Sequence, residues 1–237
     1  MQIKNTELFH IHTHRCGHAE QIPDEEFIKK AIQCGYTGIW FTDHAPFPGD
    51  PFGNRMLIDD FPSYIEELIE LKETYRKQNF SVHIGLEIEY LPTFDKTGWY
   101  QELRRNRNIE CLLLGQHMAE IAPNVYSFEK TQEEKDLFQH IWEGNNILSG
   151  LRTGYFDVLA HPDRVLKRRK EYGIHEKEIM ENIMEEAKNN DVLLEFNARS
   201  VRLELSDAQK SFLNNANTNK WIIGADAHFL SEISFDL

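Results

Sequence analysis

Short apolar runs alternate along the chain with longer amphipathic stretches. The apolar runs are too hydrophobic to leave one face in water, which is typical of strands buried on both faces. The stretches between them repeat apolar residues with the period of a helix. We therefore expect strands near 7–12, 38–43, 81–88, 110–115, 155–160, 191–197 and 221–226, and helices near 24–34, 60–78, 98–105, 131–150, 176–190 and 207–217.

Local signals support individual helices. In the stretch 24–34, Phe27 and Ala31 fall on one face, and charged residues occupy the other. Thr131, followed three residues later by Glu134, has the spacing of a capping box and predicts where the fourth helix begins.

Seven strands alternating with helices predict parallel strands covered by helices. Closure into a distorted TIM-like (β/α)7 barrel is the natural solution for one domain spanning 1–237. The segment 45–59, rich in glycine and proline, is long for a strand-to-helix loop, and we expect it to cover a substrate.

Most of the predicted strands end in a side chain that can bind a metal or a polar substrate. Because the carboxyl ends of barrel strands meet at one face, these side chains should converge. Imidazole and carboxylate together suit Zn²⁺, Mn²⁺ or Fe. The residues are His12, His14, His44, Glu87, His117, His161, Asn197, Asp226 and His228.

Six segments, taken in order, resemble the motifs of the PHP (polymerase and histidinol phosphatase) superfamily. They are HIHTHRCGHAE, GIWFTDHAP, GLEIEY, GQH, AHPD and GADAH, and the first is most similar to the histidinol-phosphatase branch. The resemblance implies three divalent metal ions. It implies one group of ligands from His12, His14, Glu87 and Asp226, a second from Glu87, His117 and His161, and a third from His18, His44 and His228.

Some positions depart from the family pattern or leave alternatives open. His10 shares a face with His12, and it either supports a ligand or has a buried structural role. Glu89 lies on the same face as Glu87 and competes with it as the bridging carboxylate; the motif favours Glu87. The chain stops at Leu237, before the further helix that the resemblance implies, and we hypothesise that a partner subunit of a homo-oligomer covers that surface.

The resemblance implies a metal-dependent phosphomonoesterase, and L-histidinol phosphate is the leading substrate. A metal-bridging hydroxide, held in place by Glu87, Asp226 and His228, would attack the ester. Arginines are expected to bind the phosphate, and the candidates are Arg202, Arg199, Arg164 and Arg55. The proton for the leaving group is open between a metal-bound water and Asp43, Asp163 or Glu120.

Three other functions remain as alternatives: a PHP phosphatase for another small phosphate ester, a PHP nuclease, and a metal-binding protein without activity. A net charge of -13 argues against nucleic acid as a partner, since such proteins need basic surfaces. The three cysteines are widely spaced, and no apolar run approaches the length of a membrane span. We therefore expect a cytoplasmic protein that does not bind membranes.

Overall fold

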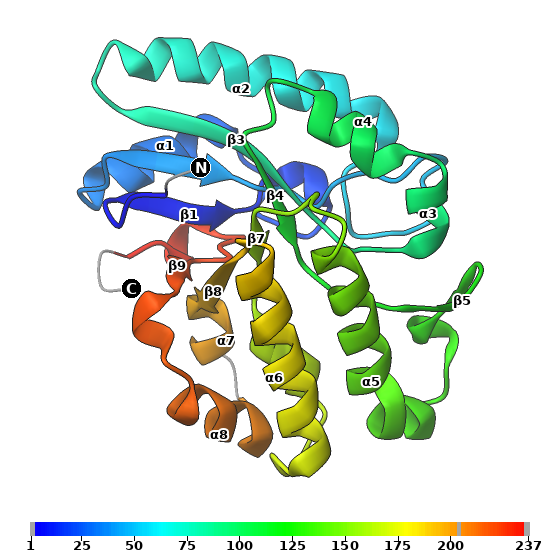
Figure 1. The fold of residues 1–237 in the computed structure, drawn as a ribbon. Helices are drawn as coiled ribbons and strands as arrows, with labels where there is room; N and C mark the ends of the chain where they lie inside the picture. Colours follow the sequence, from blue (N-terminus) through cyan, green and yellow to red (C-terminus); the bar gives the residue numbers. More distant parts are fainter. Residues whose placement is uncertain (1–2, 203–204, 235–237) are drawn as a thin grey trace.

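The computed structural model describes residues 3–202 and 205–234, and its centre is one sheet of parallel strands (Figure 1). The strands lie side by side in chain order. They are β1 (Glu7–Ile11), β2 (Gly38–Phe41), β3 (Ser81–Ile88), β4 (Cys111–Leu114), β7 (Val158–Leu159), β8 (Leu193–Asn197) and β9 (Ile222–Gly224). All seven predicted strands are present, several of them shorter than expected.

Helices cover the outside of this sheet (Figure 1). They are α1 (Asp24–Gln33), α2 (Phe61–Arg76), α3 (Pro92–Lys96), α4 (Trp99–Arg105), α5 (Gln132–Leu151), α6 (Ile174–Asn189), α7 (Ala198–Arg202) and α8 (Asp207–Asn215). The capping box predicted for α5 is confirmed, because the Thr131 side chain accepts from the Glu134 amide and Glu134 accepts from the Thr131 amide. The pattern did not predict α3, α7 or the small antiparallel pair β5 (Glu120–Ala122) and β6 (Val125–Tyr126).

The sheet is closed at the carboxyl ends of the strands. The amide of Ala225 donates to Phe9 O, and the segment after β9 then exchanges hydrogen bonds with His10 and His12. At the opposite end, β1 and β9 separate around a pocket of about 260 Å³ that Leu8 and Ile222 help to line. The result is the distorted, nearly closed seven-stranded barrel that was expected.

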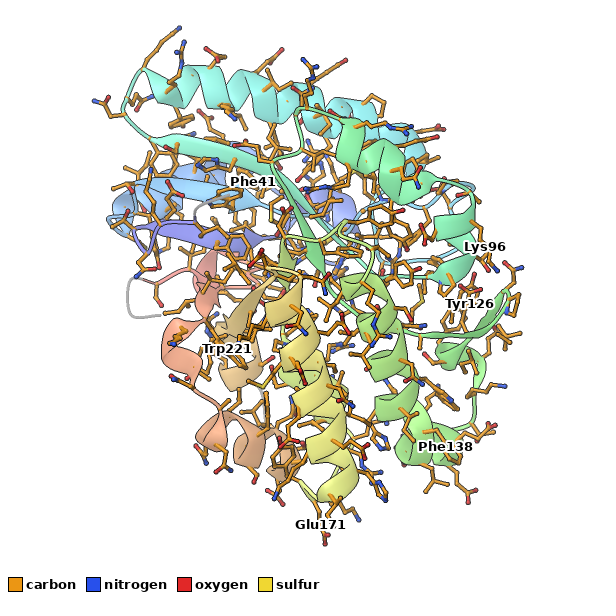
Figure 2. All side chains as sticks on the ribbon, in the orientation of Figure 1. Phe41, Lys96, Tyr126, Phe138, Glu171 and Trp221 are labelled. Carbon is orange, nitrogen blue, oxygen red and sulfur yellow. The ribbon has the colours of Figure 1, made fainter. Side chains whose placement is uncertain are left out.

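Side chains fill both faces of the strands. A small cluster inside the barrel includes Phe9, Trp40 and Leu113, whereas a much larger cluster, with Phe41 among its members, packs between strands and helices. Figure 2 shows Phe41 within this layer and Phe138 at the outer edge of α5. Because the strands are apolar on both faces, polar groups inside the barrel are concentrated near its two ends.

After His228, the described residues form only the single 3-10 turn η6 (Leu230–Glu232). Residues 235–237 lie outside the described residues, and the covering of this surface by a partner subunit stays a prediction. Among the described residues, no helix is both long enough and apolar enough to cross a membrane.

Candidate metal centre

Glu87 lies at the centre of the polar end of the barrel. It is the penultimate residue of β3, and only 1% of its surface is exposed. Gly115, which follows β4, makes room for it, since a Cβ at that position would lie 2.0 Å from Glu87 Oε1. The glycine of the GQH motif is therefore required by the position of this carboxylate.

The two oxygens of Glu87 face different histidines. Oε2 lies 3.4 Å from His12 Nε2 and 3.0 Å from His44 Nδ1. Oε1 lies 2.8 Å from His161 Nε2 and 3.6 Å from His117 Nε2. One carboxylate thus joins two groups of imidazoles, which is the arrangement required of a bridging ligand.

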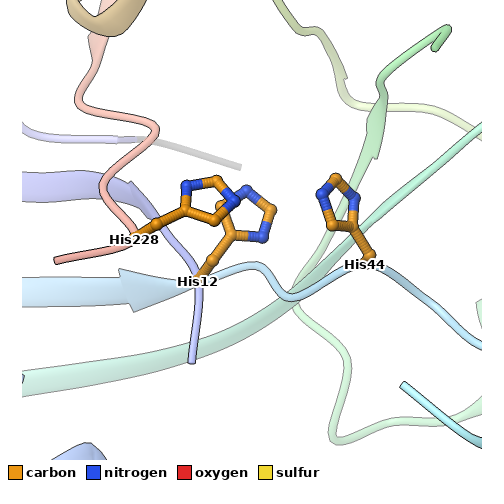
Figure 3. Close-up of side chains that lie close together, drawn as sticks. All are labelled: His12, His44 and His228. Carbon is orange, nitrogen blue, oxygen red and sulfur yellow. The ribbon is translucent and has the colours of Figure 1, made fainter. Parts of the chain in front are cut away.

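The residues that follow β9 complete the cluster. Asp226 Oδ1 lies 3.4 Å from His12 Nε2 and also 3.4 Å from His228 Nδ1. The His228 ring stacks on that of His12 with 4.2 Å between centroids, and its Nε2 lies 2.9 Å from His18 Nε2 (Figure 3). His18, although it comes from a loop, is therefore brought to the same site as His44 and His228, as predicted.

Several buried polar atoms of the cluster have no hydrogen-bond partner: His10 Nε2, both ring nitrogens of His12, and Glu87 Oε2. Nearly all buried polar atoms in proteins are paired, because leaving one unpaired costs about 1–3 kcal/mol. Nitrogen and oxygen atoms that converge without partners are suited to a cation, and this donor set fits Zn²⁺, Mn²⁺ or Fe.

Burial keeps three histidines of the cluster neutral. Burial lowers the pKa of His12 well below its ordinary value and lowers the pKa values of His117 and His228 to about 4. A neutral imidazole keeps a lone pair for a metal ion, so these three side chains are ready to coordinate at neutral pH.

The two carboxylates of the cluster stay ionised despite their burial. Burial alone would raise the pKa of Glu87, but His117, His10 and His44 hold it well below the ordinary value. Burial also opposes the ionisation of Asp226, and contact with His12 outweighs it and lowers the pKa. Ionised carboxylates gathered among imidazole nitrogens form a site for a positive ion.

The structure does not bring His14 to this cluster, contrary to the prediction. β1 ends at Ile11, and His14 begins a 3-10 turn that points its Nδ1 toward Asp24 Oδ1, 3.6 Å away. His10 takes its place, because His10, His12 and Asp226 gather their ligand atoms within 4.8 Å.

The backbone of β1 explains this exchange. His10 has a φ of 68°, and the register of β1 against β2 shifts between Leu8 and Ile11. Phe9 lies inside the barrel, so strict alternation would place His10 and His12 outside. The irregularity at His10 resets the alternation and leaves both imidazoles inside.

Glu89 is held apart from the cluster by its own partners. Its two oxygens accept from Arg55 Nη1 at 2.7 Å and Nη2 at 3.1 Å, and His117 Nδ1 lies 3.2 Å from Oε1. Burial opposes its ionisation, but Arg55 and His117 outweigh it and lower the Glu89 pKa. The Arg55 guanidinium thus joins the long loop 45–59 to β3.

The other three predicted arginines interact with different residues. Arg199 Nη1 contacts His228 Nδ1 at 2.8 Å and donates to Asp226 O and Glu232. The charge of Arg164 acts on His117. Arg202 is exposed at the end of α7, where its charge acts on Tyr36.

A pocket of about 310 Å³ opens beside the cluster. Gly53, Asn54 and Arg55 of the long loop form one wall, His44 and His117 line its base, and the half-exposed Phe128 lies at its edge. The long loop therefore borders the space beside the metal-binding cluster, and its covering of a substrate stays a prediction.

The three acids considered as proton donors are all engaged with other groups. Asp43 accepts from the Thr13 amide and hydroxyl, and burial raises its pKa to about 6. Asp163 accepts from Gln209, and Glu120 accepts from the amide of Thr93. Asp43 meets Glu87 only through the backbone, where its carbonyl oxygen accepts from the Glu87 amide at 3.0 Å, and among the described residues none of the three acid side chains hydrogen-bonds the Glu87 carboxylate.

Comparison with known proteins gives a consistent result. The model of the family described as "PHP domain" matches residues 9–199. The histidinol-phosphatase of Bacillus subtilis is 24% identical over 256 residues, covering 95% of this chain and 94% of that protein. A protein of Deinococcus radiodurans named as a probable histidinol-phosphatase is 25% identical over 244 residues, covering 95% of this chain and 87% of its own length.

A solved structure shares the fold. Histidinol phosphate phosphatase from Lactococcus lactis, complexed with zinc, L-histidinol and phosphate, superposes with a TM-score of 0.72. It is 19% identical, and the match covers 94% of this chain and 86% of that one. At this identity the likeness establishes a shared fold.

Proposed function

Because the chain belongs to the PHP domain family, we propose that it is a metal-dependent phosphomonoesterase whose substrate is L-histidinol phosphate. The reaction adds water across the ester and releases histidinol and inorganic phosphate. The observation that carries the proposal is the set of buried imidazole and carboxylate atoms without partners around Glu87. Relatives named as histidinol-phosphatases along nearly the whole chain favour this substrate over other small phosphate esters.

The proposed ligand set follows the sequence prediction with one change, in which His10 replaces His14. Glu87 bridges two groups of ligands through its separate oxygens. The residues of the full set are His10, His12, His18, His44, Glu87, His117, His161, Asp226 and His228.

Divalent ions bound there would lower the pKa of water and offset the charge that builds on the phosphoryl group. The chain's own contribution is to hold its donors in place before the substrate arrives. Asp226 and Glu87 present ionised oxygens, and the buried imidazoles of His12, His117 and His228 stay neutral.

Arg199 is our choice for the arginine that binds phosphate. Contacts with His228, Asp226 O and Glu232 fix its orientation at the rim, and 26% of its side chain is exposed. A guanidinium fork matches the oxygens of a phosphate. Arg55 instead fixes the long loop, since both of its Nη atoms donate to Glu89.

We place the protein in the cytoplasm. Cys16, Cys34 and Cys111 are all free thiols, which fits a reducing compartment. The bulk charge of -13 disfavours nucleic acid and does not disfavour a substrate that carries an amine and an imidazole.

The test is phosphate release from L-histidinol phosphate beside a panel of other small esters, with Zn²⁺ or Mn²⁺ added. We expect a strong preference for histidinol phosphate, and loss of turnover in Asp226→Ala but not in Asp207→Ala, whose side chain is 83% exposed. Equal turnover of another ester would discard the substrate and keep the reaction. No release from any ester by a metal-loaded protein would overturn the proposal.

A further inference from the structure

A second buried glutamate lies directly behind the metal centre. Glu195, in β8, points into the barrel and is fully buried. Its Oε1 lies 2.5 Å from His10 Nδ1, on the side of the ring away from Glu87. Its Oε2 accepts from the amide of His161 at 2.9 Å and from Asn197 Nδ2 at 3.2 Å.

The neighbouring strand leaves space for this carboxylate. A Cβ at Gly224 of β9 would lie 1.7 Å from Glu195 Oε1, so any larger residue there would displace it. Gly224 plays the same part for Glu195 as Gly115 plays for Glu87. Gly115 directly follows β4, and Gly224 is the last residue of β9.

Glu195 also binds two residues whose backbone conformations are unfavourable. His10 has a φ of 68° and His161 a φ of 33°, in a region that residues other than glycine seldom occupy. Such conformations are unfavourable and persist only where the surroundings enforce them. The two oxygens of Glu195 bind one of these residues each, through the His10 ring and the His161 amide.

We propose that Glu195 is a positioning residue that sets the tautomer of His10 and holds His10 and His161 as metal ligands. As a carboxylate, Glu195 only accepts, so His10 Nδ1 carries the proton and the lone pair of Nε2 points toward Glu87 and Asp226. Carboxylates behind metal-binding histidines act in this way in many metal sites. The inference rests on the proposed metal-dependent function.

The first experiment measures divalent metal affinity, with Zn²⁺ in competition with a chelator, for the wild type and Glu195→Gln. An amide at this position can serve His10 or the His161 amide as an acceptor, but its NH₂ group then faces another donor. We expect affinity about 10–100-fold weaker than in the wild type. The matched control is Glu7→Gln, a buried glutamate at the other end of the barrel, which should bind metal as the wild type does.

The second experiment needs no folded variant. Nitrogen-15 NMR of the wild-type protein should show a proton on His10 Nδ1 and none on Nε2, in the metal-loaded state. The reverse tautomer would overturn the inference. So would unchanged metal affinity in Glu195→Gln when the wild type binds metal and hydrolyses the ester, an outcome that leaves the proposed function intact. A wild type that binds no divalent metal would overturn both.

Discussion

The two ends of the barrel differ in how their charged side chains are satisfied. At the amino ends of the strands, Glu7 accepts from Lys4 and Trp40 Nε1, and Glu110 accepts from Lys72 and lies 2.9 Å from His83 Nδ1. At the carboxyl ends, Glu87 and the histidines around it leave several buried atoms without any partner.

The amino end of the sheet therefore contributes to stability, and the carboxyl end carries the functional site. The amino end contains its own cations, so every carboxylate oxygen of Glu7 and Glu110 has a donor within the protein. At the carboxyl end, the carboxylates and the imidazole lone pairs face the inside of the barrel. These groups require positive ions from outside the chain. At the amino end His83 Nε2 is left without a hydrogen-bond partner, whereas at the carboxyl end several such atoms converge in a group that suits metal ions.

Removal of metal should give the largest effect. A chelator should reduce hydrolysis of the phosphate ester to background, and added Zn²⁺ or Mn²⁺ should restore it. Because ions bind only the folded chain, metal at about 100 times its dissociation constant should add about 2.7 kcal/mol to the free energy of unfolding. Calorimetric melting with and without the ion checks this. Full turnover in a protein shown by elemental analysis to lack metal would contradict the prediction.

The Glu87→Gln variant should give the second largest effect. Glu87 faces both groups of imidazoles, and removing its charge weakens the site for each. Changing a residue that hydrogen-bonds a metal ligand typically lowers metal affinity or activity about 10–100-fold. Changing the ligand that both groups share should therefore reduce turnover by more than about 100-fold. Steady-state kinetics at saturating metal measures it. Glu110→Gln at the opposite end is the matched variant, and its turnover per folded molecule should equal that of the wild type.

At the amino end, the same Glu110→Gln variant should instead lose stability in a pH-dependent way. Burial opposes ionisation of Glu110, but hydrogen bonds from His83 and Lys72 lower its pKa to about 2. A lowered pKa gives stability that is complete above the unfolded value of about 4.5 and is lost as the pH falls toward 2. The loss in the variant at pH 7 should be on the order of 2 kcal/mol.

Urea unfolding of the wild type and Glu110→Gln at pH 7, 4.5 and 3 tests this. The difference between the two proteins should shrink across that range. The control is Glu66→Gln, at an exposed position of α2. A difference that stays constant with pH would show that the carboxylate is not the source of the stability.

Arg55→Lys should give the smallest of these effects, and it tests Glu89, a carboxylate near the centre whose oxygens already have partners. Lysine cannot reproduce the two parallel hydrogen bonds to Glu89, so the wall of the pocket should loosen. We expect KM for the ester to rise by roughly 10-fold, about the free energy of one charge-assisted hydrogen bond, with less change in kcat. Arg105→Lys, on the exposed side of α4, should leave both constants unchanged.

Much of this molecule follows from its apolar pattern. The seven strands and the longer helices were predicted because burial on both faces and helical periodicity are local signals. The same pattern placed Glu87, Asp226 and five of the histidines at strand ends, and the barrel then brought them together. The short elements α3, α7 and the β5–β6 pair carry too few residues to show a period.

The tertiary structure decided which histidines near the end of β1 lie inside the barrel, and strand alternation alone did not predict this. His12 and His14 seemed to share a face because the strand was taken to continue, whereas contacts with the segment after β9 end β1 at Ile11 and put His10 in a left-handed conformation. Glu195 gave no signal, since one acidic residue in a strand does not reveal which histidine lies opposite. The sequence determined which side chains reach the polar end of the barrel, and the closure of the sheet decided which of them face one another, because a single irregular residue reverses the direction of all that follow.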